Sequence, residues 1–314
     1  MKSVCFVGVD TSNYTTSIAA CDEAGEIIAN LKAPLPVAKG ERGLRQSEAL
    51  FAHTKNLPAL CDELSKAIRD YTPIAIGCSA RPRNIAGSYM PCFLAGIAAA
   101  HSFAASEALP VYEFSHQDGH VMAALHSSRA KIAGDFAAFH VSGGTTEILY
   151  IKQTKDGFKI ELVGGTNDLN AGQCIDRTGV MLGIDFPCGA QMDNLALENS
   201  KKLAPIKISV KELRCNLSGL ENLAADLWKK SEDRSLVSAY AFEYISKTLY
   251  SLTDNLRAVY PDLSVVYAGG VMSSTYIKSR LQRDNVYFAM PAFSADNAAG
   301  ISLLCRNKYF NGNN

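Results

Sequence analysis

Two histidines four residues apart, His116 and His120, stand in the middle of the chain. On a helix this spacing puts both imidazoles on one face. Neutral imidazole is a common ligand for zinc and iron. The pair therefore predicts half of a metal site, which a carboxylate from elsewhere in the chain would complete. The alternative is two unrelated polar residues at the start of a helix.

Asp296 is a candidate for that carboxylate. It precedes Asn297 at the start of the last predicted helix, after the segment 291–294. Aspartate is a good N-cap residue, so capping is the simpler explanation. It is also the kind of ligand that the histidine pair lacks, although the sequence alone does not place the three residues together.

Three small-residue turns could approach a nucleotide: residues 10–13, residues 142–146 and the pair Gly269-Gly270. Such turns present backbone N–H groups without a Cβ in the way, so the first two predict a clamp on a phosphate chain. A glycine pair at a strand end lets backbone approach a base or a ribose. Ordinary tight hairpins are the alternative. The chain has no Gly-x4-Gly-Lys-Ser/Thr loop, which argues against a P-loop enzyme.

Asp176 lies on a helix predicted to begin near Asn170, and a glycine-containing turn at residues 185–190 follows it. A carboxylate beside such a turn could accept hydrogen bonds from ribose hydroxyls. A surface pair with Arg177, or a helix cap, is the competing interpretation.

Composition limits the class of protein. The chain has 314 residues, 47% of them apolar, and a net charge of zero. It therefore lacks the overall basic charge of a dedicated nucleic-acid binder. Nine cysteines without a Cys-x2-Cys pair indicate free thiols in a reducing compartment. No signal peptide is evident, and the apolar run 89–105 is Ala-rich with internal polar residues, so we expect a buried helix, no membrane association and a cytoplasmic protein.

Hydrophobic patterning predicts an α/β protein in which each half opens with a strand meander. The expected strands are 3–8, 14–21, 26–31, 74–80, 111–114, 136–142, 147–152, 158–164, 265–268 and 286–289. The expected helices are 43–71, the Ala-rich run, a helix-rich stretch from 170 to about 260, and 296–305, followed by a frayed tail from Asn307. The repeated order suggests internal pseudo-symmetry with two lobes, residues 1–113 plus 297–314 and residues 114–296.

Taken together, these motifs resemble the TsaD/Gcp family of tRNA threonylcarbamoyl transferases over nearly the whole chain. The segments that carry the resemblance are 8–12, 116–120, 141–145, 171–176, 182–189, 217–220, 268–271 and 294–297. The resemblance implies the actin-like ATPase (ASKHA) fold: two lobes, each with a mixed sheet and helices, and nucleotide and metal in the cleft. It also implies transfer of a threonylcarbamoyl group from an adenylate to tRNA adenosine.

The resemblance assigns roles to individual residues. His116, His120 and Asp296 would hold one divalent ion, iron or zinc. ATP or an acyl-adenylate would contact the residues predicted to bind the nucleotide: Ser142, Gly143, Gly144, Asp176, Gly189, Gly269, Gly270 and Ser274. We predict Asp10 and the loop Ser142, Gly143 and Gly144 as the catalytic residues, with the loop amides stabilising charge near the reacting carbonyl.

The chain departs from the family pattern at several positions near these motifs. Tyr14-Thr15 replaces an acidic pair, Arg81-Pro82-Arg83 replaces Gly-Pro-Gly, Thr145 replaces a histidine, Ser274 an asparagine and Glu221 a lysine. These changes suggest a divergent paralogue.

Two main hypotheses follow. The first is a metal-dependent threonylcarbamoyl or related carbamoyl-type transferase, with tRNA as acceptor. The second is a catalytically weakened nucleotide-binding paralogue that acts as partner of a true transferase. In either case we expect a fold-related protein partner or a homodimer. A sugar kinase or ATPase ranks third, and the lack of His-Glu-x2-His argues against a metallopeptidase.

Overall fold

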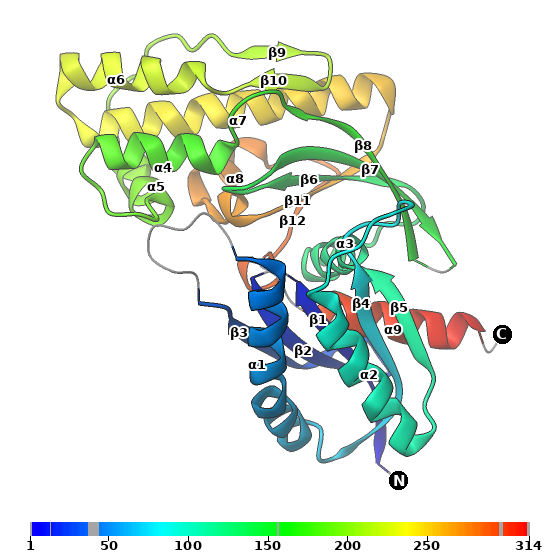
Figure 1. Ribbon diagram of the computed structural model, residues 1–314. Helices are drawn as coiled ribbons and strands as arrows, with labels where there is room; N and C mark the ends of the chain where they lie inside the picture. Colours follow the sequence, from blue (N-terminus) through cyan, green and yellow to red (C-terminus); the bar gives the residue numbers. More distant parts are fainter. Residues whose placement is uncertain (1, 13, 37–43, 156, 295–297, 313–314) are drawn as a thin grey trace. The chain divides into compact units, whose positions relative to one another are not determined.

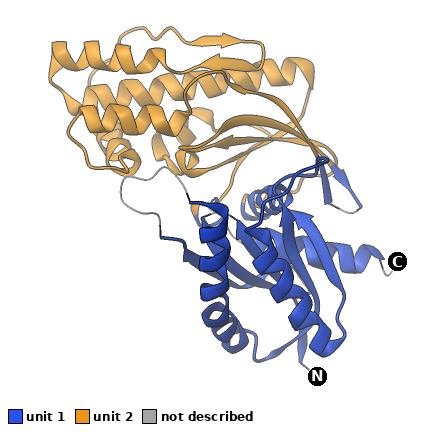
Figure 2. Ribbon diagram, in the orientation of Figure 1, with its two compact units in different colours: residues 1–127, 153–159, 292–314 blue, residues 128–152, 160–291 orange. Residues whose placement is uncertain are grey.

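The computed structural model describes residues 2–12, 14–36, 44–155, 157–294 and 298–312. The chain forms two units, each with its own sheet (Figure 2). Unit 1 comprises Met1–Ser127, Gln153–Lys159 and Ala292–Asn314, and unit 2 comprises Ser128–Lys152 and Ile160–Pro291. The lobe boundary expected between residues 113 and 114 remains a prediction.

Strand β1 (Ser3–Ser12) is the centre of the sheet in unit 1 (Figure 1), and its residues from Cys5 onward are buried. β1 pairs antiparallel with β2 (Thr15–Asp22) and parallel with β4 (Tyr71–Arg81). The outer strands are β3 (Ile27–Pro34) and β5 (Val111–Ser115), which gives the order β3-β2-β1-β4-β5. The three-strand meander predicted for the first half is confirmed.

Helices cover both faces of this sheet. α1 (Gln46–Ala67) and α2 (Phe93–Glu107) pack on one face. α9 (Ala299–Gly312) packs on the other, together with α3 (His116–Ser127). α3 directly follows β5, so the histidine helix begins at the end of a sheet strand (Figure 1).

The contact between α3 and α9 depends on paired glycines. A Cβ at Gly300 of α9 would overlap the carbonyl oxygen of Gly119 in α3. We therefore expect Gly300→Ala to push the histidine helix away and to lower the free energy of unfolding by about 3 kcal/mol. Gly312→Ala is the matched control, because nothing lies within 4 Å of its Cβ position on the same helix. Equal urea midpoints for the two variants would contradict this account of the packing.

Unit 2 repeats the same strand order and extends it. β6 (Phe136–Val141), β7 (Thr146–Thr154) and β8 (Gly157–Thr166) open the unit, and β6 pairs parallel with β11 (Ser264–Ala268). The full order is β12-β11-β6-β7-β8-β10-β9, where β12 is Val286–Phe288, β10 is Arg214–Asn216 and β9 is Ser209–Lys211. The core order β8-β7-β6-β11-β12 matches that of unit 1, which confirms the predicted pseudo-symmetry.

Five helices complete the described part of unit 2: α4 (Ala171–Met181), α5 (Gly189–Glu198), α6 (Gly219–Ser231), α7 (Arg234–Val259) and α8 (Thr275–Leu281). α7 is the central one and packs against the other four. Two short 3-10 turns, Gly270–Ser273 and Pro291–Phe293, follow β11 and β12.

One detail of the predicted elements was missing and two were wrong. The stretch 170–260 also contains two three-residue strands, β9 (Ser209–Lys211) and β10 (Arg214–Asn216). The Ala-rich helix begins only at Phe93, and it is buried on one face alone, since Leu94 and Phe103 are exposed. The tail from Asn307 is helical as far as Gly312, because Tyr309 and Phe310 both pack their rings against Phe6 of β1.

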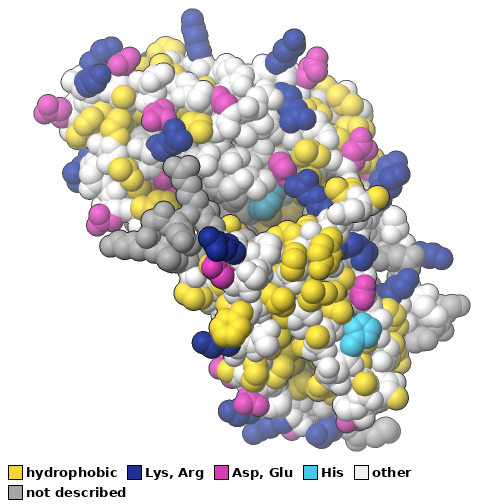
Figure 3. Space-filling view, in the orientation of Figure 1, with side chains coloured by type: hydrophobic (Ala, Val, Ile, Leu, Met, Phe, Trp, Pro, Cys, Tyr) yellow, Lys and Arg dark blue, Asp and Glu magenta, His cyan; other side chains and the backbone are white. Residues whose placement is uncertain are grey.

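The surface of unit 1 is apolar where α1 and α2 cover it (Figure 3). Phe51 of α1 is 66% exposed, and Leu94 and Phe103 of α2 are 43% and 45% exposed. Contiguous apolar surface of this kind is typical of protein contacts.

No helix in the described parts of the chain is long and apolar enough to span a membrane. All nine cysteines are free and all but Cys61 are buried, as the sequence predicted.

Candidate functional site

The two histidines face each other at the start of α3. Their Nε2 atoms are 2.9 Å apart and the ring centroids 4.4 Å apart. Both side chains are half-buried. The four-residue spacing thus brings the Nε2 atoms of the two rings close together, as the sequence predicted.

Asp10, at the end of β1, orients the first of these rings. Its Oδ1 atom is 3.1 Å from Nδ1 of His116, and the carboxylate is fully buried. A carboxylate at Nδ1 favours the tautomer in which Nδ1 carries the proton and Nε2 presents a lone pair. Oδ2 of Asp10 has no hydrogen-bond partner among the described residues. Asp10 therefore fixes the orientation of the His116 ring, which a cation would need as a ligand.

A hydrogen-bond network fixes the first turn of α3. Oδ2 of Asp118 accepts from the backbone N–H and the hydroxyl of Ser115, and Ser115 Oγ accepts from the Asp118 N–H. Asn84 also donates to Asp118 Oδ2, at 2.5 Å, and Arg81 donates to Asn84 Oδ1. Burial raises the pKa of Asp118, although these hydrogen bonds oppose the shift. Arg81 thus contacts the histidine helix through Asn84.

The histidine pair fits a divalent cation as two of its ligands. Imidazoles that bind zinc at about 2.0–2.1 Å with a tetrahedral angle hold their nitrogens about 3.4 Å apart, so the two rings, now hydrogen-bonded at 2.9 Å, would separate by about 0.5 Å around an ion. Asp296, the predicted third ligand, lies outside the described residues. Within the described ranges, no group of three or more His, Cys, Asp or Glu residues could hold a metal. The three-ligand site therefore stays a prediction.

A buried histidine of α1, His53, packs close to the end of β1. Its Nδ1 atom is 2.9 Å from Thr16 Oγ1, and its Nε2 has no partner among the described residues. Burial lowers the pKa of His53 below 6.5, although the Ser12 backbone and the Asp10 charge partly oppose the shift. The folded protein therefore holds this ring neutral.

This neutral histidine predicts a pH dependence of stability. The unfolded chain takes up a proton on His53 as the pH falls below 6.5, before the folded chain does. The free energy of unfolding is thus fully maintained above 6.5 and decreases as the pH falls through the folded pKa. Urea denaturation of the protein and of His53→Gln measures this, and an equal loss on acidification in both would contradict it.

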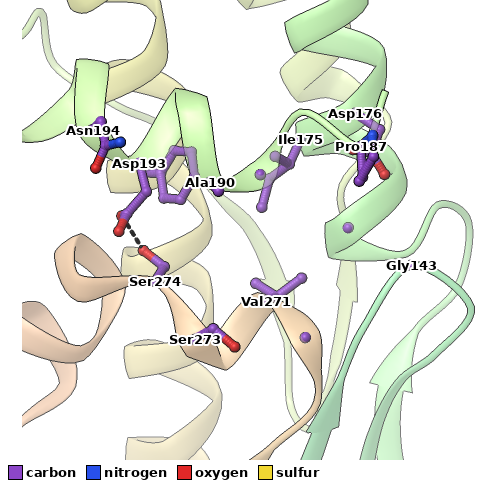
Figure 4. A pocket seen from close by; sticks show the side chains of 14 residues that line it. Gly143, Ile175, Asp176, Pro187, Ala190, Asp193, Asn194, Val271, Ser273 and Ser274 are labelled. Carbon is purple, nitrogen blue, oxygen red and sulfur yellow. Dashed lines mark hydrogen bonds between the residues drawn. The ribbon is translucent and has the colours of Figure 1, made fainter. Parts of the chain in front are cut away.

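A cavity of about 470 Å³ lies within unit 2 (Figure 4). Three glycines on its wall, Gly143, Gly189 and Gly270, have nothing within 4 Å of their Cβ positions. Backbone is thus exposed to the cavity from three different segments. The volume falls in the range of about 300–1,000 Å³ that small-molecule sites occupy.

The loop after β6 is held by its own serine. Ser142 Oγ accepts from the N–H groups of Gly144 and Thr145. α4 packs directly on the loop, since a Cβ at Gly172 would be 2.6 Å from the Gly143 nitrogen. Two of the amides that we expected to face a phosphate therefore donate within the loop.

Two aspartates order the cavity wall from α4 and α5. Asp176 Oδ1 accepts from the Cys188 N–H at 2.9 Å, next to the start of α5. Asp193 accepts from the Ser274 hydroxyl at 2.5 Å (Figure 4) and from the N–H groups of Thr275 and Tyr276, so it caps α8. Asp193 was not predicted from the sequence, because an aspartate inside a helix usually lies on the surface.

The structure gathers part of the predicted nucleotide set around this cavity: Gly143, Asp176, Gly189, Gly270 and Ser274. Ser142, Gly144 and Gly269 do not line it. Gly269 has a φ of 103°, and its missing side chain makes room for the backbone of Val141. The cavity also includes Ile175, Pro187, Asn194, Phe242 and Ser273, which were not predicted.

Of the other positions where the sequence suggested a departure from the family pattern, Ser274 is buried in the cavity wall, whereas the rest are exposed or half-buried. Tyr14 is 47% exposed. Glu221 forms an ion pair with Arg177 at 3.1 Å, so the reversed charge is compensated within the protein. Neither side chain lines the cavity of unit 2.

Solved structures share the fold of this chain. The chain is similar to HypF from T. kodakarensis, with a TM-score of 0.61 and 11% identity over 99% of this chain and 48% of that one. It is also similar to a ROK family glucokinase from Streptomyces griseus in complex with glucose and AMPPNP, with a TM-score of 0.51 and 13% identity over 96% and 99%. At these identities the comparison shows the fold alone: the two units form an actin-like ATPase (ASKHA) fold, as predicted.

Sequence comparison gives the family. Residues 27–303 match TsaD, the tRNA N6-adenosine threonylcarbamoyltransferase family, and the chain belongs to it. A relative from Streptococcus mutans named tRNA N6-adenosine threonylcarbamoyltransferase is 28% identical over 98% of this chain and 93% of its own length. One with the same name from Streptococcus suis is 26% identical over 98% and 94%.

Proposed function

We propose that this protein transfers a threonylcarbamoyl group from an adenylate to the N6 amino group of a tRNA adenosine, in the cytoplasm. The observation that carries the proposal is the family match over residues 27–303, joined to a histidine pair that a buried carboxylate orients. In the reaction, N6 attacks the carbamoyl carbon and a C–N bond forms. The bond from that carbon to the phosphate oxygen breaks, AMP leaves, and the amine proton is released.

The cavity of unit 2 is the proposed site for the adenosine part of the donor. Gly189 and Gly270 present backbone to it without side chains, and Asp176 offers a carboxylate oxygen to a ribose hydroxyl. Gly143 brings the Ser142–Gly144 loop to the same wall. Positioning by these groups would supply most of the rate, since the protein forms no covalent bond in this scheme.

The proposed metal ligands are His116, His120 and Asp296, with iron or zinc as the ion. Asp10 would keep Nε2 of His116 available through its contact with Nδ1. When bound, the ion would supply Lewis-acid stabilisation of charged oxygens. The residues of unit 1 that orient α3, Asp118 and Ser115, would hold the ligand pair in place.

Specific observations support a second candidate, a weakened paralogue that assists a true transferase. Tyr14 stands where the family has an acid, and Glu221 is neutralised by Arg177. In this role the protein would bind the adenine nucleotide and associate with a fold-related partner or with a second copy of itself.

Incubation of the purified protein with threonylcarbamoyl adenylate and unmodified tRNA tests the proposal. Nucleosides from the digested tRNA are then measured by mass spectrometry. We expect threonylcarbamoyl-adenosine with this protein alone. Product that appears only when the Streptococcus mutans relative is added, at a rate that this protein increases, would instead support the partner role. Absence of any product or rate effect would overturn both.

A further inference from the structure

The connection between α5 and α6, residues 199–216, is strongly basic. It contains one acid, Glu212, and five cations, which are Lys201, Lys202, Lys207, Lys211 and Arg214. The chain as a whole has no net charge, so all its other residues together carry a net negative charge of the same size. This concentration of positive charge in one segment indicates a polyanionic partner.

Alternating burial points two lysines of this segment outward. Ile206, Ile208 and Val210 are partly buried and pack against the core of unit 2. Lys207 and Lys211 alternate with them and are exposed. Because successive side chains of an extended chain point to opposite sides, the two lysines share the outer side, about 13 Å apart along the chain.

The hairpin of β9 and β10 adds an arginine to the same side. Its antiparallel register places Arg214 directly opposite Lys211, and both side chains are exposed. Neither forms an ion pair within the described ranges of the chain. Like charges directly opposite each other on two strands destabilise the pairing, and an anion bound between them would offset this cost. We call Lys207, Lys211 and Arg214 the basic face of unit 2.

The acid of the segment leaves the basic face without a counterion. Glu212 lies in the hairpin turn with a φ of 53°, and its backbone carbonyl accepts from Asn255 Nδ2 at 2.6 Å. Its carboxylate makes no ion pair with the residues that the structure describes. Lys201 differs from the basic face, because it is paired with Asp233 at 2.6 Å.

Polar groups accompany two of the cations in a surface depression of about 580 Å³. Lys211 and Arg214 line it together with Glu212 and with the neutral side chains Asn167, Ser209 and Asn216. Hydroxyl and amide groups beside cations are the usual partners of phosphate and sugar oxygens in a nucleic-acid backbone.

The hairpin is close to the loop that we propose for the donor, within the same sheet. β10 lies beside β8 (Figure 1), with Arg214 opposite Gly165. Gly165 lies against β7, since a Cβ there would be 2.4 Å from the Thr146 carbonyl oxygen. Thr146 follows the Ser142–Thr145 loop, so about two strand spacings, or about 10 Å, separate the Arg214 backbone from the end of that loop. A nucleic acid whose adenosine reaches the loop would have neighbouring phosphates near the hairpin.

From these observations we propose that the basic face binds the phosphate backbone of the acceptor tRNA. This assignment rests on the proposed function and adds to it the surface that holds the acceptor. Phosphate contacts position a nucleic acid without reading its sequence. The basic face therefore sets the affinity for tRNA and leaves the chemistry of transfer unchanged.

Anisotropy titration of the full chain with labelled, unmodified tRNA, in the absence of any donor, tests the proposal. The combined replacement Lys207→Gln, Lys211→Gln and Arg214→Gln should weaken binding at least about tenfold and reduce the slope of log affinity against log salt concentration by about 2–3. The matched control replaces three exposed cations of unit 1, Lys55, Lys66 and Arg69, with glutamine, and should bind tRNA as the unchanged protein does.

Two further measurements separate a lost contact from a damaged fold. Glu212→Gln removes the acid of the segment and should tighten tRNA binding about threefold, which damage to the hairpin would not do. In the transfer assay, the triple variant of the basic face should raise the KM for tRNA about tenfold, with kcat and the affinity for an adenine nucleotide unchanged.

The outcomes against the proposal are distinct from failure of the transferase activity. No measurable tRNA binding, or equal tRNA affinity and salt slope in the unchanged protein and the folded triple variant, would overturn the proposal. Binding of phosphatidylserine vesicles in place of tRNA through the three cations would also overturn it. Binding of tRNA that depends on the basic face, in a protein that forms no product, would keep this surface and remove only the transferase activity.

Discussion

Replacing His116 with alanine is expected to abolish stoichiometric binding of a divalent cation and to lower threonylcarbamoyl transfer by at least about hundredfold. The reason is that Nε2 of His116 lies 2.9 Å from Nε2 of His120 and is the ring nitrogen that Asp10 leaves available. Removal of one imidazole leaves a single histidine on that face of α3. Metal analysis of the purified variant and the tRNA assay measure the two effects separately.

Two further variants sharpen this prediction. Asp10→Asn keeps a hydrogen-bond acceptor for His116 Nδ1 but removes the charge, so cation affinity should fall about 10- to 100-fold. His101→Ala is the control, because His101 is an exposed histidine of α2 whose 3.7 Å contact is with Glu113. Full cation content and full activity in His116→Ala would rule out the proposed role of the pair.

Gly189→Leu is expected to lower the affinity for an adenine nucleotide by more than about hundredfold, with little change in stability. Gly189 is the first residue of α5, and nothing lies within 4 Å of its Cβ position, so the new side chain projects into the open cavity of unit 2. Fluorescence titration with a labelled ATP analogue measures the affinity.

Gly219→Leu is the matched control for this change. Gly219 is likewise the first residue of a helix, α6, and its Cβ position is 4.0 Å from the Tyr244 hydroxyl, outside the cavity. It should bind the nucleotide as the unchanged protein does. Equal affinities in the two leucine variants would mean that the nucleotide binds elsewhere.

The strand meanders, the order of elements and the histidine face were predictable because each depends on local periodicity. His116 and His120 share a face by helix geometry alone. The two parallel strands added to each meander follow from the same hydrophobic pattern in both halves. The actin-like fold was therefore accessible from the sequence together with the family resemblance.

Features that depend on distant contacts were not predictable. β9 and β10 have three residues each, too few to show a period. The Asn-rich end of α9 is helical because distant contacts override weak propensity, as when Arg306 donates to the Glu23 carbonyl.

The hydrogen-bond partners of individual side chains could not be predicted from the sequence for the same reason. The sequence does not show that Asp193 caps α8 from 82 positions away, or that Asn84 links Arg81 to Asp118. Asp10 was singled out, but its contact with His116 spans 106 positions.

Anomalous diffraction at the zinc and iron edges, from crystals grown with each metal, tests the central claim most directly. The account predicts one peak within about 2.0–2.2 Å of Nε2 of both His116 and His120, with a carboxylate oxygen of Asp296 at a similar distance. A metal peak remote from both rings, or fully loaded protein in which the two Nε2 atoms are still hydrogen-bonded to each other, would contradict it.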